Sequence, residues 1–589
     1  MLSLLKNQID ITHVPFSDRG SRILVYQHVN RPSFYVKLAE RLIHVEPGIE
    51  SYLRRPPFMD DLYLLGEDGQ VLDFVLTTSP DVLEFETRIG SFKLAFQDSD
   101  TLVFRLPDNT TSGLRFRVNS THWFRTDPGG EVKHVRNMSY ETLNGQVLEN
   151  KSTANFPGVE ILVQTGQDCS IGIHTWDGAK TEHIIKPFAE VQREAAARWE
   201  EWFSRVPEVD ERYRRKYAYA WWVMANNLVE PRGYLTRPAM VPSKSSYVGA
   251  WLWDSALHAM AYRHIDPELA RDQVRVMLAQ QQPDGMLPDA IFDEGVVIEI
   301  DHPMPGKVTK PPIMAWAVLK VHETEPDLNF LREVYESLVR ENRWWFEQND
   351  DDQDGIIQYT HPYSSGIDDN PLWDYGMPVE SPDINTYLQI QMASLAAIAE
   401  AIGRPEEAQA WQENANALTK RMIEHLWDEE AGLFQALLNE EPLPVLTPFH
   451  LLPLWTGQLP DKYNDRLVEH LLNPNEFSGR FKLPSVAYND PSFTQHKMWR
   501  GPVWANINYF FIEALQRIGR DDLAVELREQ TLEMIASQPG ISEYYDSLDG
   551  TAPPSSIPAF GWTSAVFIDL AIQASRTQAE KDRSVKHEG

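Results

Sequence analysis

The chain has 589 residues, and its 54 lysines and arginines against 86 aspartates and glutamates give a formal net charge of −32 at pH 7. A single hydrophobic core stops growing at roughly 250–300 residues, so at least two folded units are expected. The negative charge disfavours nucleic-acid and membrane partners, and the one cysteine, Cys169, excludes an internal disulfide and a zinc–thiolate site. Without an apolar run long enough for a signal-peptide core or a membrane span, we expect a cytoplasmic protein.

Residues 1–186 predict an antiparallel β-sandwich. Short segments rich in β-branched and aromatic residues, such as SRILVYQ and GLRFRVN, alternate with turn residues between about 8 and 182. The sequences GEDGQ and PGG are hairpin-type turns between such segments. A stretch of this length with this pattern is typical of two packed antiparallel sheets.

A charged amphipathic helix is predicted over 187–207, where the apolar period becomes helical. This helix would link the sheet domain to a helical domain over 208–576. The polar tail 577–589 is expected to be disordered.

The domain over 208–576 contains about twelve predicted helical segments, separated by proline, glycine and Asn/Asp clusters. Aromatic, small-residue segments alternate with charged amphipathic ones, which favours an inner and an outer layer of six helices each. An open α-solenoid is the alternative, but the absence of a fixed repeat and the long irregular segments favour an enzyme scaffold. The predicted fold class is therefore mainly α, an (α/α)6 barrel preceded by the β-sandwich. The segments lie near 208–229, 251–264, 266–282, 311–324, 328–348, 382–402, 404–426, 446–457, 461–472, 499–518, 520–537 and 558–575.

Two loops of the helical part concentrate carboxylates beside aromatic residues. HPYSSGIDDNPLWD contains Asp368 and Asp374, and GISEYYDSLDG contains Glu543 beside Tyr544. Inverting glycoside hydrolysis needs a protonated acid at the leaving oxygen and a second carboxylate, roughly 6.5–9.5 Å away, that activates water. Asp368 and Glu543 come from different helical hairpins, so they can face one another across a cavity. An aspartate in a glycine-containing loop is also a common turn former or helix cap.

Five motifs, in order along 208–575, resemble those of glycoside hydrolase family 63: WLWDSALHA, SGIDD followed by PLWD, WRGPVWANINYF, SEYYD and FGWTSAV. That family includes α-glucosidases and the mannosylglycerate and glucosylglycerate hydrolases, and it is related to the trehalases. The resemblance implies an (α/α)6 barrel and an inverting mechanism with Asp368 as general acid and Glu543 as general base. It implies an exo-acting α-glycosidase for an α-linked glucoside or mannoside of a small oligosaccharide or a glycosyl-glycerate type compound.

One departure from the family pattern precedes Asp368. Related hydrolases of small glycosides, and trehalases, often have Glu-Ser-Gly where this chain has Ser364-Ser365-Gly366. A carboxylate that could accept a sugar hydroxyl or tune the acid is thus missing. The identity of the substrate therefore does not transfer from those members.

Further candidate substrate contacts lie in or beside the same motifs. Asp254 of WLWD could bind hydroxyls or polarise the acid, or it could cap the helix that follows. Lys310 and Arg500 could hold an anionic aglycone, but we favour pairing with carboxylates, because an acidic site needs counter-charges. Indole and phenol faces suit the apolar faces of sugars, with ordinary packing as the alternative for any one ring. The remaining candidates are Trp251, Trp253, Trp316, Trp373, Trp499, Trp504, Tyr544 and Trp562, together with Asp374.

The acidic run DDDQDGIIQ has the spacing of a calcium loop. Asp350, Asp352 and Asp354 alternate, the next glycine permits a sharp turn, and Ile356 can offer its carbonyl. His361 stands where an EF-hand has its bidentate glutamate, which leaves only a partial loop completed by a distant ligand. An acidic turn in solvent is the alternative. No cofactor is expected to be required, and a structural Ca²⁺ at this loop is the one metal candidate.

Two other function classes stay open. A sugar phosphorylase or epimerase could use a similar barrel, although a carboxylate at Glu543 argues against phosphate as the nucleophile. A non-catalytic carbohydrate-binding protein would show aromatic residues without opposed carboxylates. The expected partner is a small carbohydrate, and the sequence does not indicate the oligomeric state.

Overall fold

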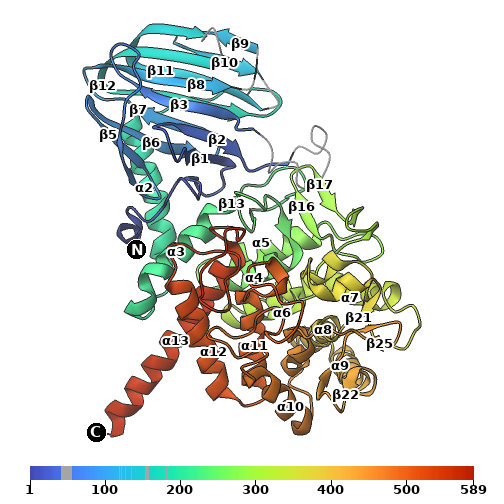
Figure 1. Ribbon diagram of the computed structural model, residues 1–589. Coiled ribbons are helices and arrows are strands. Elements are labelled where there is room, and N and C mark those ends of the chain that lie inside the picture. Colours follow the sequence, from blue (N-terminus) through green and yellow to red (C-terminus); the bar gives the residue numbers. More distant parts are fainter. Residues whose placement is uncertain are drawn as a thin grey trace. The chain divides into compact units, whose positions relative to one another are not determined.

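The computed structural model describes residues 1–41, 56–118, 120, 122–126, 128–133, 136–152, 158–180 and 182–588, with side chains up to residue 578. The chain folds into two compact units, and Figure 1 shows strands concentrated in one and helices in the other. Unit 1 consists of Met1–Val206, Ala225–Glu230 and Lys244–Val248. Unit 2 consists of Pro207–Met224, Pro231–Ser243 and Gly249–Gly589.

Unit 1 contains one antiparallel sheet, in which twelve strands are described. Nine of them hydrogen-bond in the order β1-β2-β3-β8-β12-β7-β6-β5-β4, and β11 continues from β12 to β10 and β9. The strands are β1 (Ile23–Gln27), β2 (Phe34–Leu38), β3 (Met59–Leu65), β4 (Val75–Thr78), β5 (Leu83–Thr87), β6 (Gly90–Asp98), β7 (Thr101–Arg105), β8 (Thr111–Val118), β9 (His122–Arg125), β10 (Gly129–Lys133), β11 (Asn137–Ser152) and β12 (Gly158–Trp176).

Hydrogen bonds connect the strands of unit 1 into one curled antiparallel sheet, whereas the sequence predicted two separate antiparallel sheets packed as a sandwich. The reason is β12, whose 19 residues pair with β8 over Gly158–Gln164 and with β7 over Ser170–His174. One long strand therefore joins what would otherwise be two sheets. Alternation of apolar and polar residues shows which face of a strand is buried, but not which neighbours the strand pairs with.

Helix α2 (Phe188–Ser204) lies within the range predicted for a linker helix, and it belongs to unit 1. Its buried residues recur at helical spacing and pack on the sheet. Phe188 and Val191 join a buried cluster with Val103 of β7 and Ile185. The helix therefore covers part of one face of the sheet.

Each of the twelve predicted helical segments of 208–575 contains a helix in the structure. The helices are α3 (Glu211–Asn226), α4 (Leu252–Tyr262), α5 (Pro267–Leu278), α6 (Met314–Thr324), α7 (Leu328–Gln348), α8 (Pro382–Ala401), α9 (Pro405–Leu426), η4 (Pro448–Thr456), α10 (Asp461–Leu472), α11 (Ala505–Arg517), α12 (Asp521–Ala536) and α13 (Gly561–Glu588). The element η4 is a 3₁₀ helix, and Pro453 in its interior lacks the N–H that an α-helix would use.

Six of these elements form a closed ring: α4, α6, α8, η4, α11 and α13 pack each against the next, and α13 packs against α4. Ring members are buried nearly all round, as α4 shows with all eleven residues buried. Helices α5, α7, α9, α10 and α12 pack against ring members and are exposed on their other sides. Together with the sheet of unit 1, this makes the chain a mixed protein, so the expectation of a mainly α fold is only partly right.

Short elements occupy the segments between the helices. They are η1 (Leu2–Leu5) in unit 1, and then β13 (Leu228–Val229), β14 (Ala239–Met240), β15 (Ala250–Trp251), β16 (Ala290–Phe292), β17 (Gly295–Val297), β18 (Glu299–Ile300), β19 (Gly306–Lys307), β20 (Gln358–Tyr359), η2 (Pro362–Ser365), η3 (Pro371–Tyr375), β21 (Val379–Glu380), β22 (Trp427–Asp428), β23 (Leu433–Phe434), β24 (Leu437–Leu438), β25 (Glu441–Pro442) and η5 (Met498–Arg500).

Helix α13 continues to Glu588 and so includes most of the tail for which disorder was expected. The sequence TQAEKDRSVKHE has no glycine or proline and several strong helix formers, which explains how the helix can continue. Among the described residues, no helix combines the length and the apolar character needed to cross a bilayer.

Candidate active site

An aromatic cluster brings four of the five sequence motifs together in unit 2. The rings of Trp499 and Trp504 stack with centroids 3.6 Å apart and planes 2° apart. Trp253 lies 6.1 Å from Trp499 and 5.2 Å from Trp562, and Tyr544 lies 4.8 Å from Trp504. All five rings are buried. Since they come from distant parts of the chain, their packing holds these motifs in one place.

The loop that carries Asp368 approaches this cluster at Gly366. Gly366 ends η2 with a φ of +73°, and a Cβ added there would lie 2.6 Å from the ring of Trp253. Both the left-handed backbone and the close approach therefore require glycine. The indole of Trp373 donates to the carbonyl of Ile367 at 2.9 Å and steadies the loop from its other side. Asp368 follows with a side chain that is 33% exposed.

Lys310 connects Asp368 to a buried carboxylate. Its Nζ lies 3.3 Å from Oδ1 of Asp368 and 2.9 Å from Oδ1 of Asp289, and it also donates to the carbonyl of Tyr363. Burial alone would lower the pKa of Lys310, but attraction to Asp289 and Asp368 outweighs burial and raises the pKa above its ordinary value. Lys310 is therefore charged and paired with carboxylates.

Asp254 lies in the first turn of α4, and the residue at the N-cap of that helix is Trp251. The capping role left open for Asp254 is thus wrong, because the helix begins three residues earlier than such a role requires. Burial raises the pKa of Asp254 to about 8, an effect that Lys310 partly offsets. A carboxyl group that keeps its proton near neutral pH can donate as well as accept hydrogen bonds.

Arg500 is held by the aspartates on either side of Asn370. Its Nη1 and Nη2 donate to the two oxygens of Asp374 at 2.7 and 2.6 Å, a bidentate pair. Its Nε lies 3.9 Å from Oδ2 of Asp369, whose other oxygen accepts the backbone N–H of Trp499 at 2.9 Å. These contacts join the 361–374 loop to η5.

Glu543 is buried in the segment between α12 and α13. Its N–H donates to the carbonyl of Ile557 at 2.9 Å, and its Oε2 accepts the N–H of Ile557 at 3.4 Å. The hydroxyl of Thr563 donates to its carbonyl at 3.3 Å. Burial raises the pKa of the adjacent Tyr544 to about 12, and the charges of Glu543 and Asp369 act in the same direction. The two carboxylate-bearing segments therefore share one electrostatic environment.

Three predicted tryptophans lie outside the aromatic cluster, and one of them, Trp373, packs edge-on against Tyr359. Trp316 is buried inside the ring of helices, where its indole donates to Glu513 at 3.0 Å and its ring packs edge-on against Trp455. Trp251 packs edge-on against Phe292. The motif pattern could not distinguish these positions, because core packing and sugar binding favour the same residue type.

Asp289 is the residue of the Lys310 network that the sequence analysis missed. It lies in MLPDAIF, immediately before β16, and is fully enclosed. An isolated aspartate within an apolar run is a usable signal, because a buried carboxylate requires a partner. The sequence offers no indication, however, that Lys310 is that partner.

The acidic loop after α7 brings its carboxylates together. Oxygens of Asp350, Asp352 and Asp354 lie within 4.8 Å of one another, and Asp354 forms a second such group with Glu380 and His425. Glu380 comes from β21 and is a carboxylate of the kind that a partial calcium loop would need as a distant ligand.

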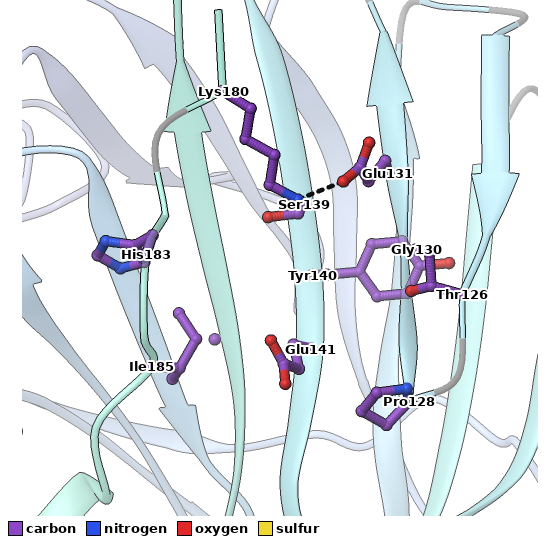
Figure 2. Close-up of a pocket in the computed structure, with 11 residues that line it drawn as sticks. Thr126, Pro128, Gly130, Glu131, Ser139, Tyr140, Glu141, Lys180, His183 and Ile185 are labelled. Carbon is purple, nitrogen blue, oxygen red and sulfur yellow. Dashed lines mark hydrogen bonds and ion pairs between the residues drawn. The ribbon is translucent and has the colours of Figure 1, made fainter.

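A separate hollow of about 270 Å³ lies in unit 1, along β10, β11 and β12 (Figure 2). Glu131, Glu141 and His183 line it, and Lys180 pairs with Glu131 across it. None of the predicted site residues is among those that line it. The candidate site is therefore the one in unit 2.

Residues 247–563 match a family model described as the mannosylglycerate hydrolase MGH1-like glycoside hydrolase domain. The mannosylglycerate hydrolase of Thermus thermophilus is 27% identical over 397 residues, which cover 55% of this chain and 95% of that protein. The glucosylglycerate hydrolase of Mycolicibacterium hassiacum is 24% identical over 420 residues, covering 55% of this chain and 92% of its own.

The crystal structure of a family 63 mannosylglycerate hydrolase from Thermus thermophilus in complex with glucose aligns with a TM-score of 0.52 and 25% identity. The alignment covers 60% of this chain and 98% of that one. The family match spans the aromatic cluster, Lys310, Asp368 and Glu543. The chain therefore belongs to the mannosylglycerate hydrolase MGH1-like members of glycoside hydrolase family 63, and it is a glycoside hydrolase.

Proposed function

We propose that this enzyme is an inverting, exo-acting α-glycosidase that hydrolyses an α-linked glucoside or mannoside of a small oligosaccharide or a glycosyl-glycerate type compound. Asp368 is the general acid and Glu543 the general base. The closed ring of helices corresponds to the inner layer of an (α/α)6 barrel, with α5, α7, α9, α10 and α12 in the outer layer.

The aromatic cluster carries this proposal, because it contacts both carboxylate-bearing segments. Gly366, two residues before Asp368, lies against Trp253, and Tyr544, directly after Glu543, lies against Trp504. Aromatic rings suit the apolar C–H faces of a sugar. The cluster can therefore form one wall of a subsite between the two carboxyl groups.

The roles of the two carboxyl groups follow from the requirements of a single displacement. Asp368 donates its proton to the glycosidic oxygen as the bond from that oxygen to the anomeric carbon breaks. Glu543 takes a proton from the water whose oxygen bonds to the anomeric carbon from the opposite face. Asp254, protonated near neutral pH, can donate to a hydroxyl of the bound sugar.

Lys310 and Arg500 are the two candidate cations near Asp368 for binding the aglycone. The relatives are named as hydrolases of mannosylglycerate and glucosylglycerate. The carboxylate of glycerate would require a positively charged partner. Lys310 is buried with its ammonium directed at three acceptors, whereas Arg500 pairs with Asp374, whose side chain is 53% exposed. Solvent reaches the Asp374 side of this pair, so a carboxylate of the substrate can compete with Asp374 for the guanidinium. Arg500 is therefore the better placed cation for an anionic aglycone.

A substrate screen tests the proposal. The compounds are glucosylglycerate, mannosylglycerate, trehalose, sucrose and the α-linked glucose disaccharides, each assayed with the wild type and with Asp368→Asn. Hydrolysis of one of them by the wild type, and its loss in the variant, is expected. Sugar phosphate formed only in phosphate buffer would instead indicate a phosphorylase, and binding without turnover would indicate a carbohydrate-binding protein.

A further inference from the structure

The ammonium group of Lys310 faces three acceptors. An ammonium carries three N–H donors, and Nζ faces Asp289 at 2.9 Å, Asp368 at 3.3 Å and the carbonyl of Tyr363. The side chains of Lys310 and Asp289 are only 5% and 3% exposed. Two carboxylates thus share one buried cation, and the more deeply buried one is closer to it.

Asp289 is itself held firmly by the surrounding backbone. Its N–H donates to the carbonyl of Val297 at 2.9 Å, and its carbonyl accepts the N–H of Leu252, the first residue of α4, at 3.1 Å. The side chain of Trp251 hydrogen-bonds to its carboxylate. Asp289 therefore fixes Lys310 relative to α4 as well as to the loop of Asp368.

A cation beside a general acid creates an electrostatic conflict. A cation favours the ionised form of a carboxyl group beside it, whereas a general acid must hold its proton when the substrate binds. A negative charge on the other side of Lys310 reduces this effect, because the potentials of the two charges oppose one another at Asp368.

We propose that Asp289 is a positioning residue for Asp368: it holds Lys310 in place and compensates its charge, so that Asp368 keeps its proton in the working enzyme. This inference rests on the proposed function, because it requires Asp368 to be the general acid.

The other titratable groups near Lys310 and Asp368 do not supply this compensation. Burial raises the pKa of Asp254 to about 8 and lowers the pKa of His361, so both are uncharged near pH 7. The aromatic ring of Tyr363 lies 5.9 Å from Nζ. Asp369 is occupied by the N–H of Trp499 and by Arg500. Burial raises the pKa of Asp289 only to about 6, which leaves it ionised at pH 7.

The test is the pH profile of kcat/KM for Asp289→Asn with an unactivated substrate identified in the screen. Asparagine keeps the shape and can still accept from Lys310, but it removes the compensating charge. The alkaline limb of the profile, where the general acid loses its proton, should shift to lower pH by about 1 unit. A glycosyl fluoride, whose leaving group needs little protonation, should lose less activity at alkaline pH. An unchanged alkaline limb would overturn the proposal.

A second variant keeps the test independent of folding. Lys310→Met should shift the alkaline limb to higher pH. Adding Asp289→Asn to this variant should shift the limb back to lower pH, towards its wild-type position. A purely structural role for Asp289 predicts lower activity in these variants without this pattern of opposite shifts, and that outcome would also overturn the proposal.

Glu341→Gln is the matched control. Glu341 is a buried carboxyl group of α7 that accepts from Gln391 at 2.9 Å, and burial raises its pKa to about 8. Its replacement disturbs a buried polar group without removing a charge near pH 7, so it should leave the profile unchanged. The two levels of inference fail in different ways. If Asp368→Asn keeps full activity, the proposed function fails. If Asp368→Asn is inactive while Asp289→Asn keeps the wild-type profile, only the role of Asp289 fails.

Discussion

Asp368 and Glu543 have unlike surroundings, as the roles of general acid and general base that we propose for them require. Asp368 is partly exposed beside a cation, whereas Glu543 is buried against the N–H of Ile557. We expect Asp368→Asn and Glu543→Gln each to lower kcat by at least about 100-fold, because an amide can neither give nor take the proton. Steady-state rates with an unactivated α-glycoside measure the effect.

The leaving group separates the two roles. A glycosyl fluoride should restore part of the rate in Asp368→Asn, because fluoride departs with little help from an acid. It should not restore the rate in Glu543→Gln, where water still lacks its base. Wild-type activity in either variant, or the reverse pattern of rescue, would contradict the assignment.

Asp254 links its protonation to the stability of the fold. Its pKa of about 8 lies far above the ordinary value of 3.8, so the folded state holds a proton that the unfolded state releases. Stability from this group is complete below pH 4 and is lost as the pH rises towards 8. Asp254→Asn has no such proton. We expect the free energy of unfolding of the variant, relative to the wild type, to rise by about 1 kcal/mol per pH unit over this range.

Urea unfolding of both proteins at several pH values measures this difference, and a difference that does not change with pH would mean that Asp254 is ionised in the folded state. Activity gives a separate readout. If Asp254 contacts the sugar, the variant should also show a raised KM.

At the scale of elements, Asp569 of α13 connects three members of the helix ring. It accepts from Arg263 at the end of α4 at 2.9 Å, pairs with His264 at 2.7 Å, and accepts from Tyr509 of α11 at 2.8 Å. Burial opposes its charge, but Arg263 and His264 outweigh burial and hold the pKa of Asp569 well below its usual range. The ring therefore closes around a buried ion pair.

We expect Asp569→Asn to lower the free energy of unfolding by about 3–5 kcal/mol near pH 7, because Arg263 would stay buried without its counter-charge. This difference in the free energy of unfolding should shrink as the pH falls below the ordinary pKa of aspartate. There the wild type also loses the stability that ionised Asp569 contributes. Denaturant unfolding provides the measurement. Asp374→Asn, which breaks a half-exposed pair, is the control and should cost about 1 kcal/mol or less. Equal losses in the two variants would contradict a special role for the buried pair.

The acidic loop between α7 and β20 is the metal candidate, and a structural Ca²⁺ there stays a prediction. A bound ion stabilises the folded state in proportion to its affinity. If it binds, Ca²⁺ should raise the Tm relative to EDTA, and Asp352→Asn should remove the difference. A Tm that is the same in Ca²⁺ and EDTA would favour the acidic turn in solvent. Activity should not depend on the ion for its chemistry.

At the scale of the whole molecule, the mechanism can be read from the configuration of the product. If Glu543 activates water in a single displacement, an α-glycoside first releases the β-anomer, before mutarotation. Proton NMR during the first minutes of turnover detects this. Initial release of the α-anomer would require two displacements and would make one of the carboxylates a nucleophile. The cytoplasmic location expected from the sequence stays a prediction as well.

The sequence by itself determined the helical part and the family. Apolar periodicity and punctuation by proline and glycine are local properties, so every predicted helical segment contains a helix. The resemblance to family 63 depended on five ordered motifs, and the family match over 247–563 confirms it. Both kinds of evidence can be read without knowing which residues meet in space.

Only the tertiary structure decided which residues pair across distance. It joined the strands of unit 1 through β12 into one sheet, started α4 before Asp254, and placed Trp316 against Trp455 and not in the aromatic cluster. It also placed Asp289 against Lys310. These outcomes depend on packing between segments far apart in the chain, where a buried charge must find whichever partner the fold supplies. Local patterns cannot encode that choice, because they describe burial and not the neighbour.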